Sequence, residues 1–292
     1  MTLEELGDTL EAGRDLLGWQ IDQVARIIDS FFDDERLEGE DADARLRLGT
    51  SYFLEPGEAS GLQADVNLSI SLPNTEERLR LVVTGALWRD DEDDEDELRR
   101  RARPGTPDED ESSSFAADLR YIVLEDLEQN LDARVGLRVR GFVPAGVTGL
   151  RYRRNWDPEG WGVRLTNQVE WETMRGFSAD SFIDFEARPA ENFFFRATPA
   201  IGWQEDRSGF EYGFGYSLTQ RLGERRFLQY SLDYDFSSSP SHGLDQILLR
   251  ARYRQTLFRT WVFGEVAPQF RLADRDGLDG TPGIEFRLQA VF

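Results

Sequence analysis

Apolar and charged residues alternate with a period of two along most of the chain. The clearest example is the C-terminal segment 281–292, TPGIEFRLQAVF, in which every second residue from Ile284 to Phe292 is apolar. Glu285, Arg287 and Gln289 occupy the positions between them. Successive side chains of a β-strand point to opposite faces of the sheet, so this pattern predicts a strand with one apolar and one charged face.

The same alternation recurs between turn-forming residues from position 45 to the C-terminus. It predicts strands near residues 45–48, 63–72, 79–84, 115–125, 130–142, 148–155, 161–173, 179–188, 193–204, 209–221, 227–237, 244–257, 260–272 and 283–292. Connectors such as ValProAlaGly at 143–146 and AspProGluGly at 157–160 carry turn residues. The prediction is an all-β protein of about fourteen antiparallel strands, or twelve if the weakest neighbours merge.

The chain ends on Phe292, directly after the alternating residues. In this respect it resembles the Gram-negative outer-membrane β-barrels, which close with a strand that ends in an aromatic residue. The resemblance implies a porin-like transmembrane barrel in the outer membrane, in contact with lipid and lipopolysaccharide. An even strand number implies that both ends of the barrel lie on the periplasmic side.

Two regions differ from the alternating pattern. Residues 1–43 are expected to form a periplasmic helix, over 2–33, followed by an acidic linker, whereas 44–292 form the barrel. Residues 89–114, with DDEDDEDE and DEDESSS, are expected to be a long external acidic loop. The apolar face of the helix would pack on the barrel, plug it, or recruit a periplasmic or membrane partner; it comprises Leu3, Leu10, Leu17, Val24 and Phe31.

Composition narrows the class of protein. No apolar run approaches the roughly 20 residues of a membrane helix, but a barrel needs none because half of each strand faces a polar interior. The net charge of −22 argues against nucleic acid as a partner. Period-two patterning alone does not say which face is wet, so a soluble β-sandwich is the alternative fold.

Aromatic residues favour the membrane orientation, because they are expected at the two lipid interfaces of a barrel. The predicted lipid-facing set includes Phe193, Phe195, Ile201, Trp203, Phe210, Tyr212, Phe214, Tyr216, Phe227, Tyr230, Leu232, Tyr234 and Phe236.

The charged faces would then line a lumen, with a basic wall opposite an acidic one. The predicted basic residues are Arg78, Arg80, Arg120, Arg134, Arg138, Arg140, Arg151, Arg153, Arg250 and Arg252. The predicted acidic residues are Glu170, Glu172, Asp184, Glu186, Glu211, Asp233 and Asp235. These walls predict a passive channel for small polar or charged solutes; the alternatives are an interior closed by salt bridges and a plugged or capped barrel that serves as a binding or scaffold protein.

The sequence gives little support for an enzymatic function. The single histidine, His242, lies beside Ser241 in the connector SSSPSHGLDQ, where adjacent side chains do not form an oriented nucleophile and base. A lipid-modifying enzyme would depend on that residue. The chain has no cysteine, so metal sites of the Cys/His type lack ligands. We therefore expect a protein that is not an enzyme and that carries no cofactor or metal.

Overall fold

The computed structural model of the chain describes residues 44–56, 61–72, 78–87, 113–126, 128–140, 143–156, 161–239, 243–273 and 277–292. The predicted helix of residues 2–33, its acidic linker, His242 and residues 89–112 of the predicted acidic loop lie outside these ranges. Within them there is no helix of the length and apolarity that a membrane crossing requires.

The described residues form fourteen β-strands, as the alternation predicts. The strands are β1 (Ala44–Leu54), β2 (Gly61–Ser71), β3 (Leu79–Leu87), β4 (Ser113–Glu125), β5 (Gln129–Arg140), β6 (Val143–Trp156), β7 (Gly162–Glu172), β8 (Gly176–Ala190), β9 (Phe193–Gln204), β10 (Phe210–Gly223), β11 (Arg226–Ser237), β12 (Gly243–Thr256), β13 (Val262–Ala273) and β14 (Gly280–Val291).

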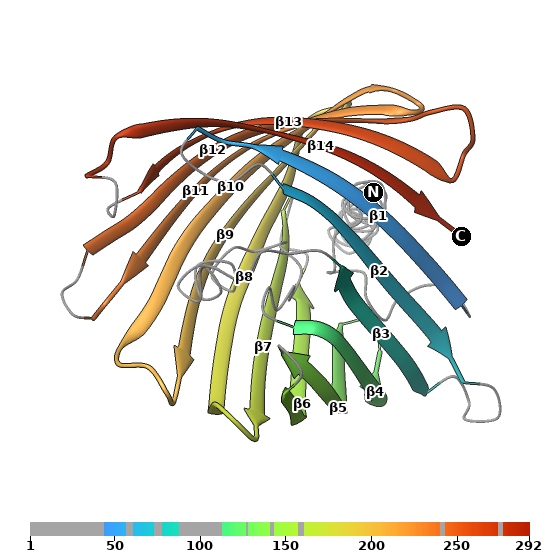
Figure 1. Ribbon diagram of the computed structural model, residues 1–292, viewed down its shortest axis with the longest axis vertical. Coiled ribbons are helices and arrows are strands. Elements are labelled where there is room, and N and C mark those ends of the chain that lie inside the picture. The colour runs from blue at the N-terminus through green and yellow to red at the C-terminus, as the bar shows by residue number, and fades with distance from the viewer. Residues whose placement is uncertain are drawn as a thin grey trace, which may run out of the picture.

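Each strand pairs antiparallel with the next along the chain, and β1 closes the barrel by pairing with β14 (Figure 1). The closing register places Arg47 opposite Val291 and Leu54 opposite Ile284. Closure leaves no unpaired sheet edge, which is the condition for a β-structure to exist in lipid.

The even strand number gives the barrel two distinct mouths. The terminal mouth is the end at which β1 begins and β14 ends, together with the turns at 191–192, 224–225 and 257–261. The loop mouth is the opposite end, with the connections after β1, β3, β5, β7, β9, β11 and β13. The predicted acidic loop follows β3, so it departs from the loop mouth.

The apolar face of each strand points outward and the ionic face inward. On β5, the Leu137 side chain is 58% exposed, whereas its neighbour Arg138 is 4% exposed. Val135 and Leu150 are likewise exposed, and Arg134 and Arg153 are buried. Aromatic rings pack on the outer face, where Tyr212 stacks on Phe236 with 5.3 Å between the ring centroids. This is the orientation of a membrane barrel, and it is the reverse of a soluble sandwich.

One member of the predicted lipid-facing set is wrong. Phe227 is 3% exposed and shares the inner face of β11 with Gln229 and Asp235. It is separated by an odd number of positions from Tyr230, which is exposed on the outside. The two therefore lie on opposite faces of one strand.

The predicted turn at 143–146 is also wrong, because these residues begin β6. They pair with β5, where Pro144 lies opposite Val139. Pairing of β6 with β7 starts only at Val147, opposite Glu172. The first residues of β6 therefore extend past the end of β7, and a proline is tolerated in a strand where one side has no ladder partner.

Candidate functional site: the ionic inner wall

The predicted basic and acidic residues occupy two sectors of the inner wall. Arg80, Arg120, Arg134, Arg138, Arg151 and Arg153 lie on β3–β6, Arg78 directly precedes β3, and Arg250 and Arg252 lie on β12. Glu170, Glu172, Asp184, Glu186, Glu211, Asp233 and Asp235 lie on β7, β8, β10 and β11. Arg140 ends β5, and its side chain is outside the described part of the chain.

An ion-pair cluster joins the two sectors where they meet. Arg138 donates to Glu170 Oε2 from Nη2 at 3.2 Å and approaches Glu172 Oε2 with Nη1 at 3.3 Å. Arg134 also pairs with Glu170. All four side chains are buried, and two guanidinium groups thus share two carboxylates.

These pairs reach from β5 to β7 across β6. Arg134 and Glu170 both lie opposite Gly149 of β6, so a row of three residues crosses the three strands. A Cβ atom at Gly149 would lie 3.2 Å from Arg134 Nε. The glycine therefore provides the space through which the Arg134 side chain reaches Glu170.

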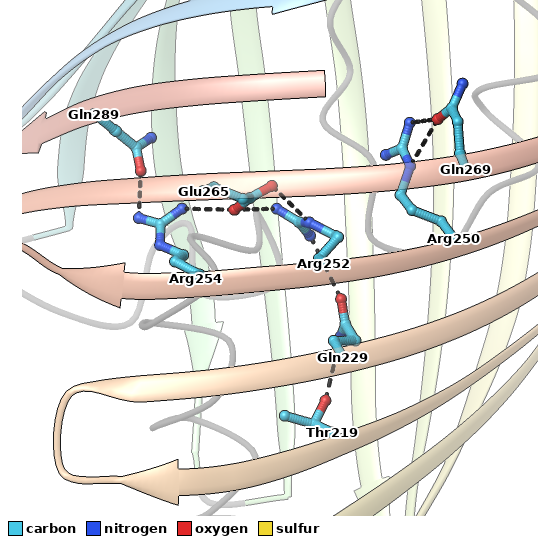
Figure 2. A network of polar contacts seen from close by, with 8 residues as sticks. All are labelled: Thr219, Gln229, Arg250, Arg252, Arg254, Glu265, Gln269 and Gln289. Atoms are coloured by element: carbon cyan, nitrogen blue, oxygen red, sulfur yellow. Dashed lines mark hydrogen bonds and ion pairs between the residues drawn. The ribbon is translucent and has the colours of Figure 1, made fainter. Parts of the chain in front are cut away.

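A second network, which we call the inner belt, crosses five neighbouring strands, β10–β14, near the terminal mouth (Figure 2). Its centre is Glu265, which accepts from Arg252 Nε at 2.9 Å and Nη2 at 3.1 Å and from Arg254 Nη1 at 3.5 Å. Arg254 also donates to Gln289. On the other side, Arg252 donates to Gln229, which donates to Thr219. The inner belt thus comprises Thr219, Gln229, Arg252, Arg254, Glu265 and Gln289.

Other inner charges are paired between adjacent strands or across the closure. Arg151 donates to Asp132 at 3.0 Å, and Arg196 Nε donates to Glu186 at 2.7 Å. Thr198 donates to Asp184 at 2.7 Å. Near the loop mouth, Arg271 pairs with Glu55. Across the closure, Arg287 of β14 donates to Asp65 of β2 at 3.0 Å. The inner wall is therefore a lattice of fixed ion pairs, which hold the arginines in place along it.

Several members of this lattice are missing from the sequence-predicted set. Glu265 and Gln289 continue the alternation of their strands, so a stricter use of the two-residue period would have included them. The pair between Asp65 and Arg287 joins positions 222 residues apart, and it depends on the closing register. No local pattern indicates that pair.

A metal site requires several ligating side chains in a suitable geometry. In the described part of the chain no group of three or more His, Cys, Asp or Glu side chains is placed to hold a metal ion. The predicted partner face of the helix, from Leu3 to Phe31, lies outside the described ranges, as does His242.

The sequence matches no protein-family model, and comparison with curated proteins gives no significant match. The structure is similar to solved outer-membrane proteins. OmpT of Vibrio cholerae is 10% identical, with a TM-score of 0.50 over 86% of this chain and 97% of that one. OpdK of Pseudomonas aeruginosa, solved with vanillate, is 8% identical, with a TM-score of 0.50 over 87% and 99%. A bacterial polysaccharide outer-membrane secretin is 10% identical, with a TM-score of 0.50 over 86% and 100%. The closed fourteen-stranded barrel, its apolar exterior and this likeness together give the chain the fold of the outer-membrane β-barrels.

Proposed function

We propose that the protein is a passive channel of the outer membrane for small polar or charged solutes. The observation that carries the proposal is the ionic inner face, on which arginines of β3–β6 and carboxylates of β7–β11 line one closed wall. Barrels of about eight strands can fill their interior with side chains, whereas sixteen to eighteen strands leave an aqueous channel. A barrel of fourteen strands is closer in size to the barrels that leave an aqueous channel.

The inner ion pairs suit this role because they fix the charges along the wall. Arg134 and Arg138 are held by Glu170 and Glu172 on one side of the barrel, and the inner belt holds Arg252 and Arg254 on β12, seven strands from β5. A solute that crosses the lumen would meet oriented charges on both sides. Such groups replace part of the hydration of a polar solute and disfavour an apolar one.

Conductance of the purified full chain in planar bilayers tests the proposal. We expect discrete conductance steps in potassium chloride, together with osmotic swelling of vesicles in small sugars or amino acids. Heat-modifiable gel migration and recovery in the outer-membrane fraction test the proposed location. Folded, membrane-inserted protein that gives neither conductance nor swelling would exclude a channel.

A second candidate is a barrel plugged by its own N-terminal segment. Phe194 and Phe227 lie on the inner face near the terminal mouth, yet they are 1% and 3% exposed. Phe263 lies on the same inner side, with the Arg254 guanidinium 4.6 Å from its ring centroid. Residues 1–43 precede β1 at this mouth, and the apolar stripe predicted there would complement such an aromatic surface.

Double-cysteine crosslinking distinguishes the plug from recruitment of a partner. The chain has no cysteine, so Val24→Cys and Phe194→Cys introduce the only thiols. Intramolecular crosslinks and a larger conductance in a Leu10→Ser, Leu17→Ser variant would support the plug. Crosslinks from position 24 only to another protein would instead support a periplasmic or membrane partner.

The prediction of a non-enzymatic protein stays a prediction. It is contradicted if the protein modifies lipid and a His242→Ala substitution abolishes that activity.

A further inference from the structure

The inner charges differ between the two mouths of the barrel. When the strand halves nearer the terminal mouth are counted together, their inner faces carry more arginines than carboxylates. We call this half the basic band: it contains Arg45, Arg47, Arg80, Arg151, Arg153, Arg164, Arg196, Arg252 and Arg254, against Glu125, Asp132, Glu186 and Glu265.

The half nearer the loop mouth carries the opposite excess. We call it the acidic band: it contains Glu55, Glu170, Glu172, Asp180, Glu211 and Asp235, against Arg138 and Arg271. Residues of both signs lie between the bands, close to the strand midpoints, among them Asp118, Arg120, Arg134, Asp184 and Arg250.

Ion pairing within each band does not cancel its excess. In the basic band, Glu186 pairs with Arg196, and Glu265 is shared by two arginines of the same band. In the acidic band, Arg138 is shared by Glu170 and Glu172, and Arg271 pairs with Glu55. Each of these pairs lies within one band, so it leaves the difference between the arginines and the carboxylates of that band unchanged.

Resting on the proposed channel, we propose that the lumen is bipolar along its axis and that it favours small zwitterionic solutes over ions of a single sign. A cation must cross the basic band, and an anion must cross the acidic band, so each meets a region of its own sign. A zwitterion carries no net charge. It can also align with its cationic group toward the acidic band and its anionic group toward the basic band.

The same arrangement requires the ionic current to rectify. Cations concentrate in the acidic band and anions in the basic band. When the loop mouth is positive, the field drives both ions out of the bands that hold them and toward the middle of the pore, where they accumulate. The opposite voltage depletes the middle of both ions. The current is therefore larger with the loop mouth positive.

Salt concentration tests the proposal on the unmodified chain. The Debye length is about 10 Å at 0.1 M salt and about 3 Å at 1 M, so wall charges act across the lumen only at the lower concentration. We expect a current ratio of about two between opposite voltages at 0.1 M and about one at 1 M. Biotin on an Asp206→Cys variant, at an exposed turn of the loop mouth, with streptavidin added to one side, reports the orientation of each pore.

Substitution of adjacent arginines provides the matched comparison. Arg153 faces the lumen within the basic band, whereas Arg154 is exposed on the outer side of β6, with its guanidinium 5.2 Å from the Trp156 ring centroid. Arg153→Gln should lower the current ratio, and Arg154→Gln should leave it unchanged. If Arg153→Gln fails to fold, the salt series on the unmodified chain still decides the matter.

Vesicle swelling tests the predicted preference for zwitterionic solutes. Glycine betaine should enter faster than choline or a carboxylate anion of similar size. An equal current at both voltages in 0.1 M salt, the opposite sign of rectification, or faster entry of either single-sign ion would overturn the bipolar pore and leave the channel itself intact. A folded protein that gives neither conductance nor vesicle swelling would exclude the channel, and this inference with it.

Discussion

Replacement of Glu265 by Gln should destabilise the barrel, because Glu265 is the only carboxylate of the inner belt. The Glu265 carboxylate accepts two hydrogen bonds from Arg252 and a third from Arg254. Glutamine has nearly the same shape, but it presents an uncharged amide to both guanidinium groups. The two cations would then lie close together without the anion that they share.

The magnitude follows from the burial of the three side chains. Removal of one partner from a buried ion pair costs about 3–5 kcal/mol, because the remaining charge stays desolvated. The Arg252 side chain is 21% exposed, so water in the lumen screens part of that cost. We therefore expect a loss near the lower limit, about 3 kcal/mol. With a urea dependence of about 3 kcal/mol per molar, the unfolding midpoint would fall by about 1 M.

Unfolding in urea from lipid vesicles measures this loss, because seven tryptophans report on the lipid environment through their fluorescence. Glu224→Gln, in the exposed turn between β10 and β11, is the matched control and should change stability by less than about 0.5 kcal/mol. A Glu265→Gln midpoint equal to that of the control would refute the reasoning. So would strict additivity with Arg252→Gln, since removal of either partner should make loss of the other less costly.

Three further substitutions test other parts of the structure. Gly49→Ala places a Cβ against the Asp65 carboxylate and should disturb the hydrogen bond between Asp65 and Arg287 at the closure. We expect a loss of about 1–3 kcal/mol in urea unfolding. Gly61→Ala is the control, because the added Cβ would have open space around it and should cost little. Leu150→Arg, on the outer face at the middle of β6, should lower the free energy of unfolding from lipid by about 2–4 kcal/mol. Phe258→Arg, in an exposed turn, should lower it by about 1 kcal/mol or less. Equal losses would contradict a position of Leu150 near the middle of the bilayer. The backbone N–H groups of Glu128 and Gln129 donate to Asp126 and lower the pKa of its carboxyl. The stabilisation of this turn should therefore be present above the ordinary aspartate pKa and be lost as the pH falls through the lowered one, which carboxyl titration by NMR and Asp126→Asn would check.

The alternation predicts the strands and their orientation because burial in a barrel wall has the same period as the strand itself. Leu137 and Arg138 show the rule within one pair of neighbours. The rule fails where residue type is used in place of position. Phe227 is aromatic, as a lipid-facing residue often is, but it occupies an inner position of β11. Strict counting from Asp235 places it correctly.

Strand ends follow from the neighbouring strands, which explains why turn residues predict them less well. Pro144 and Gly146 are typical of a turn, yet both lie in β6 because β5 continues beside them. Likewise β14 begins at Gly280, before the first clear alternation at Ile284, since it pairs with β13 from Leu272 onward. The length of a strand in a barrel depends on the partner as much as on its own sequence.

To predict which inner charges pair with each other, one must know the register of the strands. Once the register is known, the glycines indicate where a side chain reaches across a strand. Gly49 lies opposite Asp65, and Asp65 reaches past it to Arg287 on the far side of β1. Gly149 lies opposite both Arg134 and Glu170, which meet over it. In each case a residue without a side chain separates two charges that form an ion pair. An inner-face glycine that lies between a carboxylate on one neighbouring strand and an arginine on the other therefore predicts an ion pair that spans three strands.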